Sequence, residues 1–157
     1  TAALYGCAVT TGLGTIENKA QIRLGDLVVI FGAGGIGLNL VQGAVLAGAA
    51  RVVAVDLYDN RLALAQRIGA TDVINGATVD AFQTIGQVLG GEAVDVFVDN
   101  TGQPEVIAKG YQIIKSSGRV VLVGVPKNGA KTSLNTLDLH FGKPLIKSKA
   151  KHSSLAF

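Results

Sequence analysis

The sequence predicts an α/β fold built on a doubly wound, parallel six-stranded sheet in the strand order 3-2-1-4-5-6. Short apolar runs of β type alternate with helix-compatible segments, and short connections rich in Gly and Asp separate them. The composition is aliphatic, with 48% hydrophobic and only 5% aromatic residues. Such a composition is typical of parallel strands that helices cover on both faces. We therefore expect residues 1–157 to form one domain of this kind.

The expected elements follow from the positions of these runs. Strands are predicted at residues 27–31, 51–55, 71–74, 93–98, 118–123 and 144–148. Helices are predicted within residues 1–20, over about a dozen residues after Gly37, and at 61–68, 78–89 and 104 to about 115. Asp59 is the expected N-cap of the 61–68 helix, and Pro104 is the expected first residue of the last helix. Right-handed crossovers between these strands give the predicted order.

Residues 27–61 contain the most informative pattern. The apolar run 27–31 leads into GAGGIG at 32–37, a helical segment follows, and the next apolar run ends in an acid. This is a β-turn-α-β unit with the spacing of a dinucleotide-binding site. Its first Gly permits the tight turn, its second leaves room for a pyrophosphate, and its third lets the helix pack closely on the strand. The residues predicted to bind the cofactor here are Gly32, Gly34, Gly35, Ile36 and Gly37.

Asp56 is the acid at the end of this unit, 19 residues after Gly37. A carboxylate at this place can accept hydrogen bonds from both hydroxyls of an adenosine ribose, which favours NAD over NADP. The same pattern is compatible with a tight turn that binds no ligand, and with a related fold that binds S-adenosylmethionine. Two further polar turns, 99–102 and 124–126, follow strands four and five and are expected to face the same cleft.

Charge and composition argue against several classes of function. The net charge is +3, with no dense basic patch interleaved with aromatic residues, so we expect no nucleic-acid partner. The apolar stretches are shorter than the roughly 18 residues that a membrane span needs, so we expect no membrane partner. Cys7 is the single cysteine and fits a reducing, cytoplasmic location. The chain contains no Met, and we interpret it as a fragment of a longer protein.

Several segments together carry a family resemblance. They are GCAVTTGLG at 6–14, then residues 28–37, 52–56, 64–72 and 118–126. These segments resemble the coenzyme domain of zinc-dependent medium-chain alcohol dehydrogenases, and the resemblance covers nearly the whole chain. Its most specific part is the Gly-Cys-x-Val-x-Thr-Gly-x-Gly pattern, which other dinucleotide-binding domains lack.

The resemblance implies roles for individual residues. Cys7 would be the third protein ligand of the catalytic zinc, and Thr11 would pack against the nicotinamide ring. Arg61 would lie near the adenosine ribose, beside Asp56. Asn100 and Thr101 would border the adenosine side, whereas Val123, Gly124 and Val125 would reach the nicotinamide end through backbone groups. A buried apolar Cys, a solvated Arg and ordinary turn residues are the alternatives that need no ligand.

The sequence also departs from the family pattern. The other catalytic zinc ligands belong to a preceding catalytic domain, and no His-Glu pair occurs in this chain. His140 and His152 are interpreted as surface or packing residues, and the four-cysteine structural zinc lobe is absent. Residues 147–151 read KSKAK, where the family commonly has small, glycine-rich residues near the nicotinamide.

The resemblance therefore implies the NAD-binding domain of an alcohol dehydrogenase. The intact enzyme would transfer a hydride between an alcohol or aldehyde substrate and NAD at a catalytic zinc, whereas the fragment alone is expected to be inactive. A homodimer or tetramer through the sixth edge strand is expected. The alternatives are a non-catalytic NAD(H)-sensing module and a zinc-independent quinone or enoyl reductase, which usually prefers NADPH. Asp56 argues against the reductase.

Overall fold

The predicted six-stranded sheet is confirmed in a computed structural model, which describes residues 14–15, 19–134 and 145–147. All strand pairs are parallel, in the order β3-β2-β1-β4-β5-β6. The strands are β1 (Leu27–Phe31), β2 (Arg51–Asp56), β3 (Asp72–Asn75), β4 (Val94–Asp99), β5 (Ile114–Leu122) and β6 (Leu145–Lys147). The helices are α3 (Gly35–Leu46), α4 (Asp59–Arg67), α5 (Ala81–Val88) and α6 (Pro104–Ile113).

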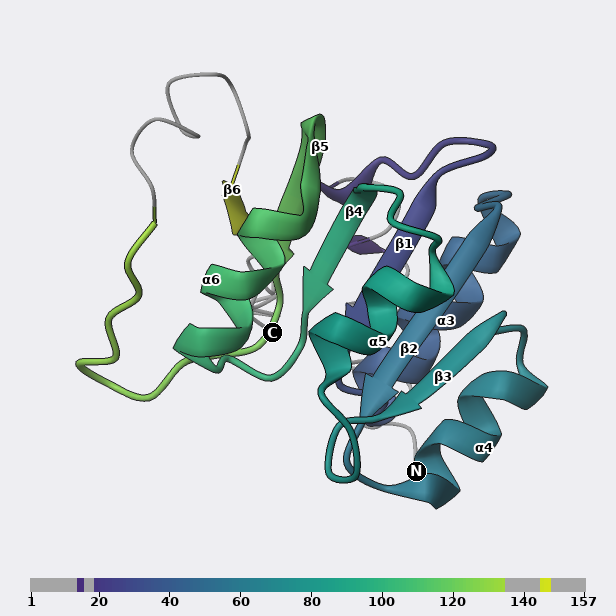
Figure 1. Cartoon of the computed structure of the whole chain (residues 1–157), viewed down its shortest axis with the longest axis horizontal. Coiled ribbons are helices and arrows are strands. Elements are labelled where there is room, and N and C mark those ends of the chain that lie inside the picture. The colour runs from purple at the N-terminus through teal and green to yellow at the C-terminus, as the bar shows by residue number, and fades with distance from the viewer. Residues whose placement is uncertain (1–13, 16–18, 135–144, 148–157) are drawn as a thin grey trace, which may run out of the picture.

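Helices cover both faces of the sheet (Figure 1). Alternate residues of each strand point to opposite faces, so one strand contributes to two cores. The core under α3 and α4 includes Val28, Ile30, Leu40, Val41, Ala54 and Ala65. The core under α5 and α6 includes Val29, Phe31, Ile85, Phe97, Tyr111 and Val120. Because β1 is buried along its whole length, its apolar run lacks the alternation of a half-exposed strand.

The crossover pattern positions a crevice at one end of the sheet. From β1 the chain crosses through α3 to β2, whereas from β4, on the other side of β1, it crosses through α6 on the opposite face to β5. The connections after β1 and β4 therefore diverge to opposite faces. A crevice opens outside the carboxyl ends of such strands, which is the usual ligand position in open α/β sheets.

Two element boundaries differ from the sequence prediction. Asp59 was predicted as an N-cap but is the first residue of α4, and its Oδ1 accepts a hydrogen bond from Asn75 Nδ2 at 2.6 Å. The strand β5 begins at Ile114 instead of 118, because Lys115 reaches Asp95 on β4 at 2.9 Å and extends the pairing of the two strands. The helix predicted within 1–20 lies mostly outside the described residues.

The helix α5 begins later than predicted and has a side-chain cap. Asp80 Oδ1 accepts the backbone N–H groups of Phe82 at 2.9 Å and Gln83 at 3.0 Å. The Gln83 bond is the main reason that the pKa of Asp80 lies below its ordinary value of 3.8. The Phe82 bond and the positive charge of Lys109 lower this pKa further, whereas desolvation opposes them.

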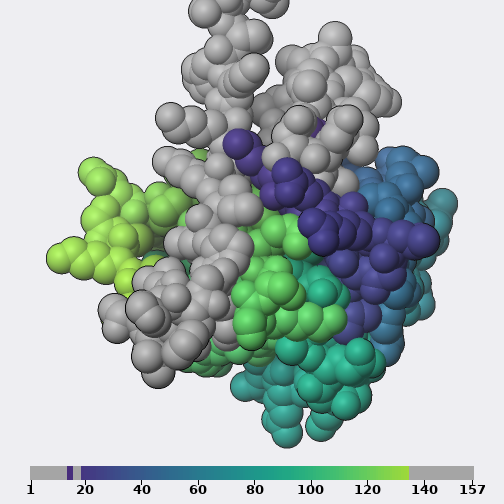
Figure 2. All heavy atoms as spheres, turned by 90° about the horizontal axis from the view of Figure 1, so that it is seen from above, coloured from purple at the N-terminus to yellow at the C-terminus, as the bar shows by residue number. Residues whose placement is uncertain are grey.

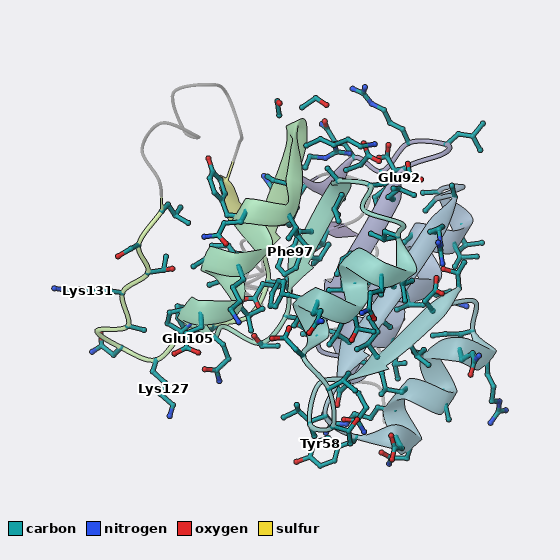
Figure 3. The ribbon with its side chains drawn as sticks, viewed as in Figure 1. Tyr58, Glu92, Phe97, Glu105, Lys127 and Lys131 are labelled. Carbon is teal, nitrogen blue, oxygen red and sulfur yellow. The ribbon has the colours of Figure 1, made fainter. Side chains whose placement is uncertain are left out.

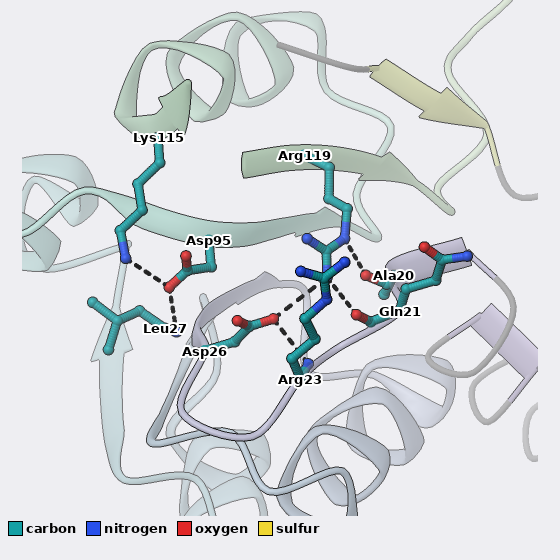
Figure 4. A network of polar contacts seen from close by, with 8 residues as sticks. All are labelled: Ala20, Gln21, Arg23, Asp26, Leu27, Asp95, Lys115 and Arg119. Carbon is teal, nitrogen blue, oxygen red and sulfur yellow. Dashed lines mark hydrogen bonds and ion pairs between the residues drawn. The ribbon is translucent and has the colours of Figure 1, made fainter. Parts of the chain in front are cut away.

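Polar contacts fix residues 20–27 to the amino ends of the strands (Figure 4). Arg119 on β5 donates to the carbonyl oxygens of Ala20 and Gln21 and pairs with Asp26 at 3.4 Å. Asp95 accepts the N–H of Leu27 at 2.9 Å, in addition to its ion pair with Lys115. Figure 2 shows the start of the described chain, in purple, lying across this end of the molecule beside β5. The end that carries the crevice is therefore the opposite one.

Candidate cofactor-binding cleft

A cavity of about 430 Å³ lies at the carboxyl ends of β1, β2 and β4. Side chains of Tyr58 and Glu92 lie at opposite ends of the sheet, with Tyr58 on the cavity side (Figure 3). The lining residues include Phe31, Gly32, Gly34, Asp56, Leu57, Tyr58, Arg61, Asn100, Thr101, Gln103 and Val106. Six of the residues predicted from the sequence thus line one cavity. They are Gly32, Gly34, Asp56, Arg61, Asn100 and Thr101.

The glycine turn after β1 has the geometry that its sequence predicts. Gly32 has a φ of +97°, which favours Gly, and its N–H donates to Val55 O at 2.8 Å. A Cβ on Gly37 would lie 2.8 Å from Gly32 C and closer still to Gly32 O, so only Gly allows α3 to approach the turn this closely. A Cβ on Gly34 would meet no protein atom within 4 Å.

Gly34 is the N-cap of α3 and provides no side-chain cap. The first N–H groups of a helix lack intrahelical partners and favour anions, and a Cβ on Gly34 or Gly35 at this helix end would meet no protein atom within 4 Å. Gly35, Ile36 and Gly37 form the first turn of this helix. The turn and the helix end therefore leave a space that suits a pyrophosphate.

Asp56 is buried at the edge of the cavity, with its side chain only 5% exposed. Its Oδ2 accepts the N–H of Ala33 at 2.7 Å, and its Oδ1 accepts the N–H groups of Leu57 at 2.8 Å and Tyr58 at 3.1 Å. Arg61 Nη1 lies 3.6 Å from Oδ2. Asp56 thus binds the end of β2 to the glycine turn, and Arg61 approaches the same carboxylate oxygen that accepts the N–H of Ala33.

The sequence did not single out Tyr58 and Gln103, which also line the cavity. The guanidinium of Arg61 lies over the ring of Tyr58, 4.7 Å from the centroid. An aromatic residue two positions after the acid of the second strand is the signal that could have identified Tyr58. Gln103, the N-cap of α6, resembles any other exposed polar residue in a turn.

The turns after β4 and β5 contact each other beside the cavity. Asp99 O accepts the N–H groups of Val123 at 2.8 Å and Gly124 at 3.0 Å. Val123 and Gly124 do not line the cavity, whereas Val125 borders a second hollow of about 500 Å³. That hollow also contains Thr101 and Gln103, so the two hollows adjoin. Cys7 and Thr11 lie outside the described residues.

Comparison with known proteins identifies the family. A sequence model described as zinc-binding dehydrogenase matches residues 35–149. The chain belongs to the zinc-binding dehydrogenase family. The resemblance inferred from the sequence is thereby confirmed, and the chain corresponds to the coenzyme-binding domain of a medium-chain alcohol dehydrogenase.

Relatives of this dehydrogenase chain include a curated protein and two solved structures. S-(hydroxymethyl)glutathione dehydrogenase of Synechocystis sp. is 39% identical over 144 residues, which cover 89% of this chain and 38% of that protein. Benzyl alcohol dehydrogenase from Acinetobacter calcoaceticus superposes with a TM-score of 0.83 at 32% identity, covering 90% of this chain and 39% of the other. A zinc-binding dehydrogenase from Sinorhizobium meliloti, described as putative and bound to NADP, superposes at 0.82 and 30% identity, covering 90% and 42%.

The chain thus spans about two fifths of the length of each of these relatives. Among the described residues, no group of three or more His, Cys, Asp or Glu side chains could hold a metal ion. The described part of this dehydrogenase chain also has no helix that is both long and apolar enough to cross a membrane.

Proposed function

We propose that this chain is the NAD-binding domain of an alcohol dehydrogenase that transfers a hydride between an alcohol or aldehyde and NAD at a catalytic zinc. The single observation that carries the proposal is the cleft itself, in which a glycine turn, an open helix N-terminus and a buried carboxylate adjoin one cavity. Family membership and the names of the relatives support the reaction class.

The residues present fit a dinucleotide. The open space beside Gly34 and the first turn of α3 would accept the pyrophosphate, and the 430 Å³ cavity would accept the adenosine. Asp56 and Arg61 would bind the ribose, with Asn100 and Thr101 along the adenosine side. Backbone groups of Val123, Gly124 and Val125 would reach the nicotinamide end. When bound, the nicotinamide supplies the two-electron hydride acceptor.

The preference for NAD rests on the charge at the ribose position. The Asp56 carboxylate is buried and already accepts three backbone N–H groups, so its negative charge is firmly held in place. The negative charge of Asp56 would repel the 2′-phosphate of NADP at this position. Arg61, the neighbouring cation, already lies beside the Asp56 carboxylate. Asp56 Oδ2 keeps acceptor capacity for a ribose hydroxyl, because its contact with Arg61 is longer than a hydrogen bond.

Zinc enters this proposal through the family and through Cys7, which we propose as one of its protein ligands in the intact protein. Thr11, four residues later in the sequence, is proposed to pack against the nicotinamide. The described residues hold no complete set of zinc ligands. In the intact protein, the remaining ligands would come from a region equivalent to the part of the relatives that this chain does not span.

Calorimetric titration with NADH and NADPH tests the cofactor proposal. We expect the chain to bind NADH at least about tenfold more tightly than NADPH, a difference of ~1.4 kcal/mol. A clear preference for NADPH would contradict the proposal and would favour the zinc-independent quinone or enoyl reductase, which usually prefers NADPH. The purified chain is expected to oxidise no alcohol with added NAD, and turnover by the chain alone would contradict the assignment as a domain.

Assembly and location complete the proposal. We propose a homodimer or tetramer through β6, because this strand forms one edge of the sheet and an edge strand can pair with its copy across a two-fold axis. A cytoplasmic location is proposed from the single cysteine. A reading frame that encodes a Cys and a Gly-His-Glu segment before Thr1 would support the enzyme, and one without them would support the NAD(H)-sensing alternative.

A further inference from the structure

A fully buried carboxylate holds the turn that follows β4. Asp99 has no exposed surface. Its Oδ1 accepts the N–H of Thr101 at 3.0 Å and the Thr101 hydroxyl at 2.6 Å, and its Oδ2 accepts the N–H of Gly102 at 3.0 Å. The ion pairs among the described residues do not include Asp99. Its charge is therefore held by the donors of a single turn.

The same residue connects this turn to the one after β5. The carbonyl of Asp99 accepts the N–H groups of Val123 and Gly124. The two turns also touch through their backbones, because a Cβ on Gly102 would lie 2.6 Å from Val125 O, and a Cβ on Gly124 would overlap Gly102 N. A shift of residues 99–102 would therefore displace residues 123–125.

The turn after β4 also packs against the glycine turn. The N–H of Asn100 donates to Phe31 O at 2.9 Å. A Cβ on Gly32 would lie 3.4 Å from both Asn100 Cβ and Thr101 Cγ2, so these side chains already lie against the turn that faces the pyrophosphate position. Three turns that border the cleft, after β1, β4 and β5, thus meet at residues 99–102, and the buried side chain of Asp99 holds the conformation of these residues.

We propose that Asp99 is a positioning residue for the cofactor, which it does not itself touch. It sets the relative placement of the adenosine-side residues Asn100 and Thr101, the glycine turn and the nicotinamide-side turn 123–125. This role rests on the proposed binding of a dinucleotide in the cleft. A ligand that spans all three turns should depend on Asp99 more strongly than one that occupies the adenosine cavity alone.

Asp95 provides a matched control on the same strand. Its Oδ2 accepts the N–H of Leu27 and pairs with Lys115, both at 2.9 Å, at the opposite end of β4 from the cleft. Asp99→Asn and Asp95→Asn are the same chemical change in one strand. If Asp99 only stabilised the fold, the two variants would lower stability without a specific change in ligand affinity.

The experiment titrates wild type, Asp99→Asn and Asp95→Asn with NADH and with AMP, at a temperature where each protein is folded. NADH binding can be followed by the fluorescence of NADH itself. We expect Asp99→Asn to weaken NADH binding by about tenfold and AMP binding by only about threefold, since each charge-assisted hydrogen bond it loses is a strong one. Asp95→Asn is expected to leave both affinities unchanged.

The outcomes separate this inference from the proposed function. Wild type that does not bind NADH would overturn the proposed function. Wild type that binds, with Asp99→Asn binding equally well or Asp95→Asn losing as much affinity, would overturn the role of Asp99 alone. Equal losses for NADH and AMP would overturn its role in joining the two ends of the cleft.

Thr101 keeps the inference testable if Asp99→Asn does not fold. Thr101→Val removes the hydroxyl bonded to Asp99 at nearly constant shape, whereas Thr101→Ser retains the hydroxyl. We expect the Val variant to bind NADH about threefold more weakly than the Ser variant, because only the Ser variant keeps the hydroxyl that is bonded to Asp99. Equal affinities for the Val and Ser variants would contradict the role of the buried carboxylate.

Discussion

Replacement of Gly37 by Ala would test the close packing of α3 on the glycine turn. The added Cβ would overlap the backbone of Gly32, with 2.8 Å to its C atom and less to its O atom. Backbone atoms cannot rotate away as a flexible side chain could, so α3 must move. Overpacking of this kind costs about 3 kcal/mol, and the higher helix propensity of Ala offsets roughly 1 kcal/mol of it.

The expected net loss in Gly37→Ala is therefore about 2 kcal/mol, which corresponds to a decrease in Tm of roughly 4–8 °C for a domain of this size. Thermal unfolding followed by circular dichroism measures it. Gly86→Ala is the matched control, because Gly86 lies in α5 and a Cβ there meets no atom within 4 Å. Its Tm is expected to rise by about 2–4 °C from helix propensity alone.

The same Gly37→Ala protein should bind NADH at least about tenfold more weakly, because its α3 N-terminus is displaced from the phosphate position. Gly86→Ala should bind NADH as wild type does. A Gly37→Ala protein with an unchanged or raised Tm would refute the packing argument. An unchanged NADH affinity would refute the position of the pyrophosphate.

Three further substitutions test other parts of the account. Asp80→Ala should lower the Tm at neutral pH. Because the pKa of Asp80 is lowered in the folded chain, the stabilising effect of its carboxylate is present above the ordinary pKa of 3.8 and is lost as the pH falls through the lower pKa of the folded chain. A difference in Tm between wild type and variant that persists below both pKa values would contradict this. Arg119→Gln should lower the stability to urea by about 2 kcal/mol, because it loses contacts with two carbonyl groups and Asp26, and an unchanged midpoint would contradict their contribution. Asp56→Asn should narrow the preference for NADH over NADPH in calorimetry, and an unchanged ratio would exclude Asp56 as its source.

The sheet order could be predicted because each strand is a short apolar run and each crossover is right-handed. The glycine turn could be predicted because its spacing is tied to local backbone geometry, as the positive φ of Gly32 and the contact at Gly37 show. These features depend on residues that are close in the sequence. The family resemblance added the reaction class but no geometry.

The remaining features depend on contacts between distant residues. Ile113 and Ile114 suit either a helix or a strand, and the pairing of Lys115 with Asp95 on β4 decides where β5 begins. Asp99 resembles an ordinary turn residue in the sequence, and its burial against the turn after β5 has no local signal. Tyr58 enters the cavity because α4 begins immediately after it.

The central claim, that the glycine turn and the adjoining cavity bind a dinucleotide, is tested most directly by NADH binding to Gly34→Ala. Gly34 has a φ of −71° and a ψ of −169°, which Ala adopts without strain, and its Cβ would enter open space. We predict an unchanged Tm and a loss of NADH affinity of at least about tenfold, because the methyl group would occupy the pyrophosphate position. A Gly34→Ala protein that binds NADH as tightly as wild type would contradict the claim.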